Sequence, residues 1–125
     1  IAITVGPKGN FRTIAEALDR ARDGSVVIIS EGVYPEAVDV SRDLCLKGIG
    51  ALGSVVIQNN YGTILQLRGE NMRIDNLTLS CNGDTLDAAV VVSRGRSLIA
   101  GCVIKTVGRT ALEVLAASTC NLVDV

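Results

Sequence analysis

The sequence predicts an all-β protein, a right-handed parallel β-helix (a solenoid of short strands) with one N-terminal capping α-helix. Three observations lead to this fold class. The 125 residues are 48% hydrophobic but only 2% aromatic, and aliphatic strands of this kind are typical of parallel sheets. One convincing helical pattern stands near the start of the chain. A short segment also recurs at a spacing of roughly 25 residues, as expected of a coiled chain with stacked turns.

The first element, residues 1–24, is predicted to form a short strand and the capping helix. Thr13 and Glu16 have the spacing of a capping box. Gly24 is expected to end the helix in a left-handed conformation. Because the first coil would otherwise expose strand edges and its interior, we expect the helix to cover that end. The apolar stripe that would face the coil consists of Ile14, Ala17, Leu18 and Ala21.

The rest of the chain, residues 25–125, is predicted to form coils, so that residues 1–125 make a single domain whose C-terminal end is open or truncated. No helical pattern lies between the strands, which excludes a doubly wound sheet. The predicted strands are 25–30, 37–40, 43–47, 54–58, 63–67, 72–79, 88–93, 97–104, 110–115 and 119–125.

An internal repeat sets the expected register of these coils. The segment Gly69–Leu79 is similar to Gly95–Ile104, and a third copy begins at Cys120. This register predicts that Leu79 lies beneath Ile104. It also predicts an interior stack of Leu77, Cys102 and Val125.

Composition narrows the possible partners. With 12 basic and 13 acidic residues, the chain has no excess charge that would favour nucleic acid or an anionic membrane. No apolar run approaches the roughly 20 residues of a membrane span. We therefore expect neither nucleic acid nor a membrane as a partner.

Cysteine and glycine patterns predict no metal site and no cofactor. No C-x-x-C pair and no histidine occurs, so the cysteines are expected to be buried thiols, which slightly favours an intracellular location. Gly48–Gly53 matches a dinucleotide fingerprint, but strand residues follow where that fingerprint needs a helix. The four cysteines are Cys45, Cys81, Cys102 and Cys120.

Three motifs in order resemble the pectin lyase-like right-handed parallel β-helix superfamily. They are Gly9–Ile14 with the helix after it, Gly32–Val40, and Leu46–Gly50. The likeness is greatest to the N-terminal half of pectin methylesterases and to non-catalytic β-helix repeat modules. It implies a β-helix with a capping helix over most of the chain.

The same resemblance implies where catalytic residues would stand. The esterases use a Gln-rich strand face with two Asp and an Arg, and this chain has Asp87 near the first Gln position. It has Arg109 and Thr110 near the second Gln and its Asp. The catalytic Asp pair and Arg are expected beyond Val125. Asp84 and Asp87 suggest a carboxylate pair, but a turn role is favoured for both.

Two groups of residues are candidate ligand contacts. Tyr61 beside Asn59 and Asn60 could pack against a sugar ring, although an exposed turn is the simpler interpretation. The basic residues Arg94 and Arg96, with Arg109 downstream, could bind an anion, although a solvated turn is favoured. Asp87 is the last candidate, because the family resemblance places it near the first Gln of the esterases.

Two functions follow from this reading. The first is a non-catalytic scaffold or recognition module for a protein, possibly for a polysaccharide. The alternative is the N-terminal portion of a pectin methylesterase-like carbohydrate esterase whose catalytic residues lie outside this chain. The open coil at 118–125 is expected to bind a protein partner or a second copy of the chain.

Overall fold

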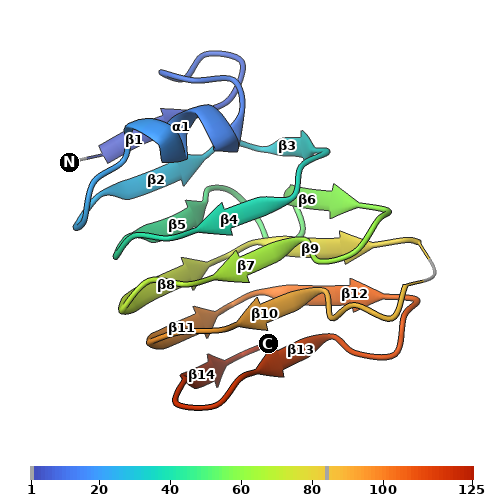
Figure 1. The fold of residues 1–125 in the computed structure, drawn as a ribbon. Helices are drawn as coiled ribbons and strands as arrows, with labels where there is room; N and C mark the ends of the chain where they lie inside the picture. The colour runs from blue at the N-terminus through green and yellow to red at the C-terminus, as the bar shows by residue number, and fades with distance from the viewer. Residues whose placement is uncertain (1, 84) are drawn as a thin grey trace.

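The computed structural model describes residues 2–83 and 85–125, which form one helix and fourteen short strands (Figure 1). The elements are β1 (Ala2–Val5), α1 (Ile14–Arg20), β2 (Val26–Ile29), β3 (Gly32–Tyr34), β4 (Val38–Val40), β5 (Cys45–Gly48), β6 (Val55–Asn59), β7 (Leu65–Leu67), β8 (Asn71–Asp75), β9 (Thr78–Cys81), β10 (Val90–Val92), β11 (Arg96–Ala100), β12 (Val103–Thr106), β13 (Leu112–Val114) and β14 (Thr119–Val123).

The strands form three sheets in which every pair is parallel. Sheet A has the order β1-β2-β5-β8-β11-β14, sheet B the order β12-β9-β6-β3, and sheet C the order β13-β10-β7-β4. After α1 the chain visits A, B and C in turn, and each strand lies beside its counterpart in the previous coil (Figure 1). The predicted parallel β-helix with one capping helix is confirmed.

The register agrees with the repeat in the sequence. Leu79 pairs with Ile104. Leu77 and Cys102, which immediately precede β9 and β12, are both buried. Val125, which we expected to stack inside with them, is 50% exposed. The register of β11 and β14, in which Ala100 pairs with Val123, places Val125 opposite Cys102 as predicted, and its side chain is half exposed because no later coil covers it in the described chain.

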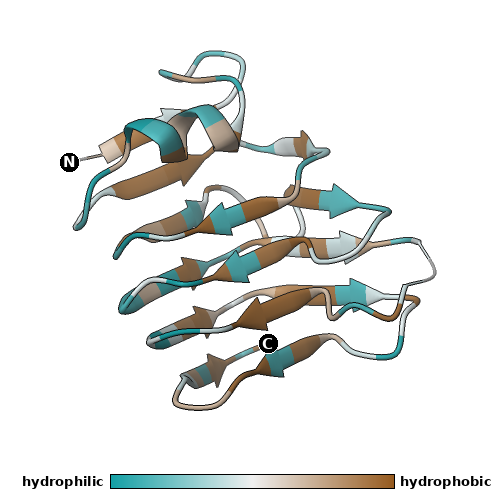
Figure 2. Cartoon of the chain, in the orientation of Figure 1, coloured by the Kyte–Doolittle hydropathy of each residue, from teal (hydrophilic) through white to brown (hydrophobic). Residues whose placement is uncertain are grey.

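The core is a ladder of aliphatic side chains inside the coil. Leu46, Ile74 and Ile99 are fully buried and stack on successive strands of sheet A. Figure 2 shows hydrophobic residues along the strands of every coil. Each such side chain contributes about 1.5–3 kcal/mol when removed from water, so stacked aliphatic residues can support the fold without an aromatic core.

The capping helix is fixed at its start by two side chains. Thr13 Oγ1 accepts the Glu16 N–H at 3.2 Å, which confirms Thr13 as the N-cap. The Glu16 carboxylate accepts the Thr13 hydroxyl at 2.8 Å, in place of the backbone N–H that a full capping box would use. Glu36 reaches across from the first coil, and its carboxylate accepts the N–H groups of Ile14 and Ala15 at 2.9 and 3.0 Å. The helix is thereby attached to the coil that it covers.

The helix ends earlier than the sequence suggested. Its C-cap is Ala21, which is extended (ψ 147°) and whose N–H donates to Ala17 O at 2.9 Å. Gly24 does have a positive φ of 88°, but it belongs to the next turn. The assignment of Gly24 as the helix cap is therefore wrong, because the extended backbone at Ala21 keeps that buried side chain on the core.

Single left-handed residues divide two of the predicted strands. Asn76 (φ 54°) separates β8 from β9, and Gly101 (φ 59°) separates β11 from β12. The Asn76 side-chain amide donates to Gly48 O and Gly50 O, both at 3.0 Å, so it holds the bend against the previous coil. β3 was not predicted, because Gly32–Tyr34 has no aliphatic run, and it forms by pairing with β6.

Candidate functional site

Five of the seven predicted ligand residues lie where sheet B turns into sheet C. Strands β7, β10 and β13 pair in register, with Leu65 beside Val90 and Val90 beside Leu112. The turns that precede these strands therefore belong to consecutive coils. We call them the B–C corner: residues 60–64, residues 82–89 without 84, and residues 107–111. Asn60, Tyr61, Asp87 and Arg109 lie in it, and Asn59 ends the strand that leads into it.

Tyr61 is the free member of the predicted sugar-contact group. Its side chain is 87% exposed. The Asn59 amide closes the turn instead, since Nδ2 donates to Tyr61 O at 3.0 Å and Oδ1 accepts the Tyr61 N–H at 3.3 Å. The backbone of Asn60 packs so tightly on Gly83 that a Cβ there would meet Asn60 O at 1.7 Å. Asn59 and Asn60 thus shape the turn that presents Tyr61.

Asp87 and Arg109 occupy consecutive coils of the same corner. Both are exposed, and neither side chain forms a hydrogen bond or ion pair with another described residue. The Asp87 N–H donates to Thr85 Oγ1 at 3.1 Å, a local bond of the kind expected in a turn. Asp84, the suggested partner of Asp87, lies outside the described residues.

Two further exposed residues at this corner were missed. Leu86 is 79% exposed and Val107 is 65% exposed, and together with Tyr61 they give each of the three turns one large apolar side chain in water. The signal in the sequence was an isolated apolar residue among turn residues in each repeat. Because turns often contain such residues, that signal alone did not separate an outward side chain from a buried one.

Arg94 and Arg96 lie at a different corner, between sheet C and sheet A. Arg94 pairs with Glu70 (Nη2 to Oε1, 2.5 Å). The guanidinium of Arg96 has no carboxylate within 4.0 Å among residues 2–83 and 85–125. The structure does not bring Arg109 together with these two arginines. Arg109 precedes β13, whereas Arg94 precedes β11 and Arg96 begins it.

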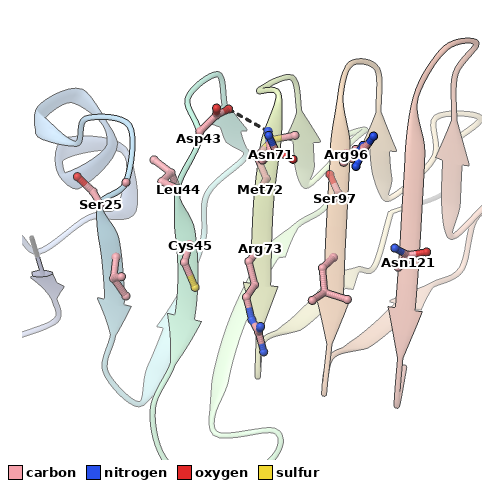
Figure 3. A pocket seen from close by; sticks show the side chains of 13 residues that line it. Ser25, Asp43, Leu44, Cys45, Asn71, Met72, Arg73, Arg96, Ser97 and Asn121 are labelled. Carbon is pink, nitrogen blue, oxygen red and sulfur yellow. Dashed lines mark hydrogen bonds between the residues drawn. The ribbon is translucent and has the colours of Figure 1, made fainter.

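The outer face of sheet A carries a shallow hollow of about 420 Å³. Figure 3 shows Cys45 on β5, Arg73 on the next strand, β8, and Asn121 on β14, two strands further along the sheet. Arg73 Nε donates to Asp75 Oδ2 at 2.7 Å, and the Cys45 thiol lies 3.7 Å from the same oxygen. Burial and the nearby Asp75 charge raise the pKa of the Cys45 thiol, so it stays protonated near neutral pH and is a poor nucleophile.

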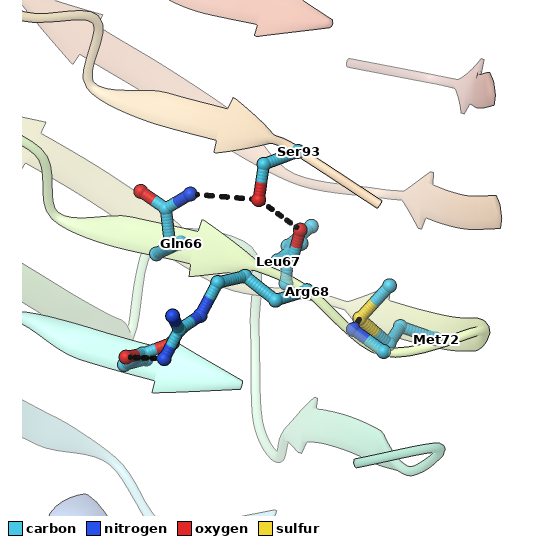
Figure 4. Close-up of polar contacts among 7 residues, drawn as sticks. Gln66, Leu67, Arg68, Met72 and Ser93 are labelled. Carbon is cyan, nitrogen blue, oxygen red and sulfur yellow. Dashed lines mark hydrogen bonds and ion pairs between the residues drawn. The ribbon is translucent and has the colours of Figure 1, made fainter. Parts of the chain in front are cut away.

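Polar side chains on sheet C also bond to one another rather than projecting freely (Figure 4). Gln66 Nε2 donates to Ser93 Oγ at 3.0 Å. Arg68 Nε donates to Asp39 Oδ1 at 2.9 Å, and its Nη2 contacts Asp39 Oδ2 at 2.5 Å. These pairs tie neighbouring coils together, which gives the face a structural role.

The described residues contain no cluster of three or more His, Cys, Asp or Glu side chains that could hold a metal ion. In the same part of the chain, no helix has the length and apolar character needed to span a membrane.

Solved pectin methylesterases are similar to the described chain. The enzyme from Aspergillus niger in deglycosylated form superposes with a TM-score of 0.83 at 18% identity, over 98% of this chain and 48% of that one. PemA from Erwinia chrysanthemi gives 0.80 at 18% identity, over 96% and 48%. A pectin methylesterase mutant in complex with hexasaccharide IV gives 0.76 at 18% identity, over 96% and 48%.

This chain therefore spans about half the length of each of those structures. By sequence, no protein-family model and no curated protein matches it. At such low identity the likeness establishes architecture, and it agrees with the resemblance carried by the three motifs. The chain has the parallel β-helix fold that is found in those pectin methylesterases.

Proposed function

We propose that the chain is a non-catalytic recognition module that binds a protein partner at the B–C corner. One observation carries the proposal: Tyr61, Leu86 and Val107 are 87%, 79% and 65% exposed in three consecutive turns. Single exposed apolar residues are ordinary, whereas several at one place indicate an interaction surface. Aromatic residues in particular are enriched in the centres of protein interfaces.

The charges beside these residues support a protein partner. Asp87 and Arg109 stand in consecutive coils with opposite sign and without partners among the described residues. Such a pair can orient a complementary surface and exclude one of the wrong polarity. A sugar site is supported less well, because the Asn59 amide that would bind a hydroxyl group is already bonded to the Tyr61 backbone.

The backbone under the corner is held by the parallel ladder. The N–H groups of Ala89 and Val90 donate to Thr110 O and Ala111 O at 3.1 and 2.9 Å. Contacts presented on a rigid frame lose little conformational freedom on binding. The corner therefore has the apolar centre, flanking charges and rigidity that recognition requires.

The test uses the whole chain as bait in an extract of its source organism. A protein that is captured and identified is then purified, and its Kd is measured by calorimetry against three forms of the chain. We expect Tyr61→Ala combined with Leu86→Ser to raise Kd by about tenfold or more. Val33→Ser is the matched control, because Val33 is 58% exposed but lies on β3. Equal binding by all three forms would contradict the proposal.

The alternative proposal is the N-terminal portion of a carbohydrate esterase, and the fold likeness favours it. Asp87 and Arg109 have the positions that the family resemblance assigns to its Gln residues, in the turns before β10 and β13, which pair in register. The assay is methanol release from methyl-esterified pectin by the longest natural form of the protein that contains this chain, because the alternative places the catalytic residues outside residues 1–125. Release by that protein establishes the esterase and overturns the recognition module. No release, with partner binding at the B–C corner intact, supports the module.

A further inference from the structure

Three polar side chains form a ladder at the corner where sheet C turns into sheet A. Asn71, Arg96 and Thr119 pair in register on β8, β11 and β14. They line one side of a hollow of about 610 Å³. Asn71 and Arg96 also border the hollow on the outer face of sheet A, where Figure 3 places them at adjacent strands. The two depressions therefore meet at Arg96.

Arg96 differs in charge balance from the arginines around it. Arg68, Arg73 and Arg94 each have a carboxylate within 4.0 Å. Arg96 has none in the described chain. Since these three arginines are neutralised by the protein itself, Arg96 is the one of the four that an external anion would meet without displacing a carboxylate.

The acids nearest to this ladder are already engaged. Glu70, which also lines the hollow, is held by Arg94 at 2.5 Å. Asp43 Oδ1 accepts the backbone N–H groups of Glu70 and Asn71 at 2.7 and 3.0 Å. Both carboxylates thus have bonds that keep them away from the Arg96 guanidinium.

The backbone that carries the ladder is closely fixed. Gly95 has a φ of 67°, and a Cβ at this position would lie 2.2 Å from Gly69 O. The Arg96 N–H donates to Glu70 O at 2.7 Å, and the Thr119 N–H donates to Gly95 O at 2.9 Å. Because this backbone is rigid, the Cα–Cβ bonds of Asn71, Arg96 and Thr119 have fixed directions. A fixed arrangement of side chains is suited to binding a ligand.

We propose that Asn71, Arg96 and Thr119 bind an oxyanion, either a carboxylate or a phosphate group of a ligand. The guanidinium can donate two parallel hydrogen bonds to two oxygens of one such group. The Asn71 amide and the Thr119 hydroxyl can each donate one more from the neighbouring coil. This site lies at the other end of sheet C from the B–C corner, so it can be correct or wrong independently of the proposed function.

The experiment is an NMR titration of the whole isotope-labelled chain, with sodium phosphate and sodium acetate in separate arms at constant ionic strength. We expect saturable shifts of the N–H signals of residues 71, 96 and 119 in at least one arm. Saturation by phosphate alone identifies a phosphate ligand, and saturation by acetate alone identifies a carboxylate. Linear shifts in both arms, shared by every exposed arginine turn, overturn the proposal.

Two substitutions make the assignment specific. Arg96→Gln is expected to raise Kd for the anion by about tenfold, while the rest of the spectrum confirms that the chain is folded. Thr119→Val should weaken binding less, because it removes one neutral donor. Arg109→Gln is the matched control, since Arg109 is also exposed and unpaired among the described residues but lies at the B–C corner. A change in Kd equal to that of Arg96→Gln in this control would show general charge screening and no site.

Discussion

The two ends of the coil solve the same problem to different degrees. At the first coil, Val5 of β1 and Ile14 of the capping helix are both fully buried. At the last described coil, Leu122 and Val123 are each 50% exposed. A stack of parallel strands has no natural end, because each coil buries only the face that its neighbour covers. Among the described residues, the coil face that α1 covers is buried, and the face that no element covers is half exposed.

The covering element is small and depends on a few contacts. α1 has seven residues, too few to be stable as an isolated helix. It therefore relies on its buried stripe and on the carboxylate of Glu36 from the first coil. Changes at this end should cost more stability than similar changes at the open end.

The largest expected effect is loss of the apolar contact under the helix. Ile14→Ala should lower the free energy of unfolding by about 2–5 kcal/mol, because it leaves a cavity at a fully buried position. Leu122→Ala should lower it by about 1 kcal/mol or less, since half of that side chain is already in water. Urea denaturation followed by circular dichroism measures both. If both substitutions lowered the free energy of unfolding by the same amount, the proposed difference in stability between the two ends of the coil would be wrong.

The next effect tests the carboxylate that holds the helix. Glu36→Gln removes the charge and leaves one acceptor for two N–H groups, so we expect a loss of about 1–2 kcal/mol. Glu31→Gln is the control, because Glu31 is exposed and makes no hydrogen bond among the described residues. Urea denaturation at low ionic strength gives both values. A control that is as destabilised as Glu36→Gln would show that charge in general, and not this contact, stabilises the cap.

The open end leads to a prediction about association. We propose that the exposed edge of β14 pairs with a second copy of the chain, since unpaired strands present free N–H and C=O groups. Light scattering at high protein concentration should then give a mass above that of one chain. Leu122→Lys should weaken association by about tenfold, roughly 1.4 kcal/mol.

Leu52→Lys provides the control for association, because Leu52 is 67% exposed in the loop between β5 and β6, away from that edge. It should associate like the unchanged chain. If the unchanged chain remains monomeric at high concentration, the proposal of self-association at this end is wrong.

Much of the fold was predictable because its causes are local or periodic. The N-cap bond between Thr13 and Glu16 depends on residues three apart, and the pairing of Leu79 with Ile104 depends on a repeat. The predictions that failed were those of strand ends that are set by contacts with the neighbouring coil. The bend at Asn76 exists because its side chain bonds to two carbonyls of the previous coil, and nothing within residues 72–79 specifies those partners.

The candidate site was predictable to a smaller degree. Tyr61 could be recognised as a lone aromatic in a turn, but Leu86 and Val107 needed the structure to show that they face water at the same corner. The grouping of Arg94, Arg96 and Arg109 was wrong, since proximity along the chain does not indicate which corner of a coil a residue occupies. Which corner of the coil a surface residue occupies depends on the lengths of the strands and turns before it, and these lengths differ from coil to coil.

The smallest effect concerns the tyrosine beneath the cap and has a defined pH dependence. Tyr34 is 7% exposed, and its hydroxyl donates to Ser30 O at 2.7 Å. Burial, with the charge of Glu36 second, raises the pKa of Tyr34 above its usual 10.0. The folded chain thus keeps this proton at a pH where the unfolded chain has lost it. Its contribution to stability is complete below pH 10 and is lost as the pH rises through the folded pKa.

Tyr34→Phe should therefore cost about 1 kcal/mol at neutral pH through the lost hydrogen bond, and the difference from the unchanged chain should narrow above pH 10. Urea denaturation across this range measures both curves. The raised pKa values of Cys45, Cys102 and Cys120 also lower stability at alkaline pH, but they are common to both proteins and cancel in the difference. Parallel curves up to about pH 11 would mean that the phenol is as accessible to hydroxide in the folded chain as in the unfolded one, and that the first coil is closed less tightly than its buried side chains indicate.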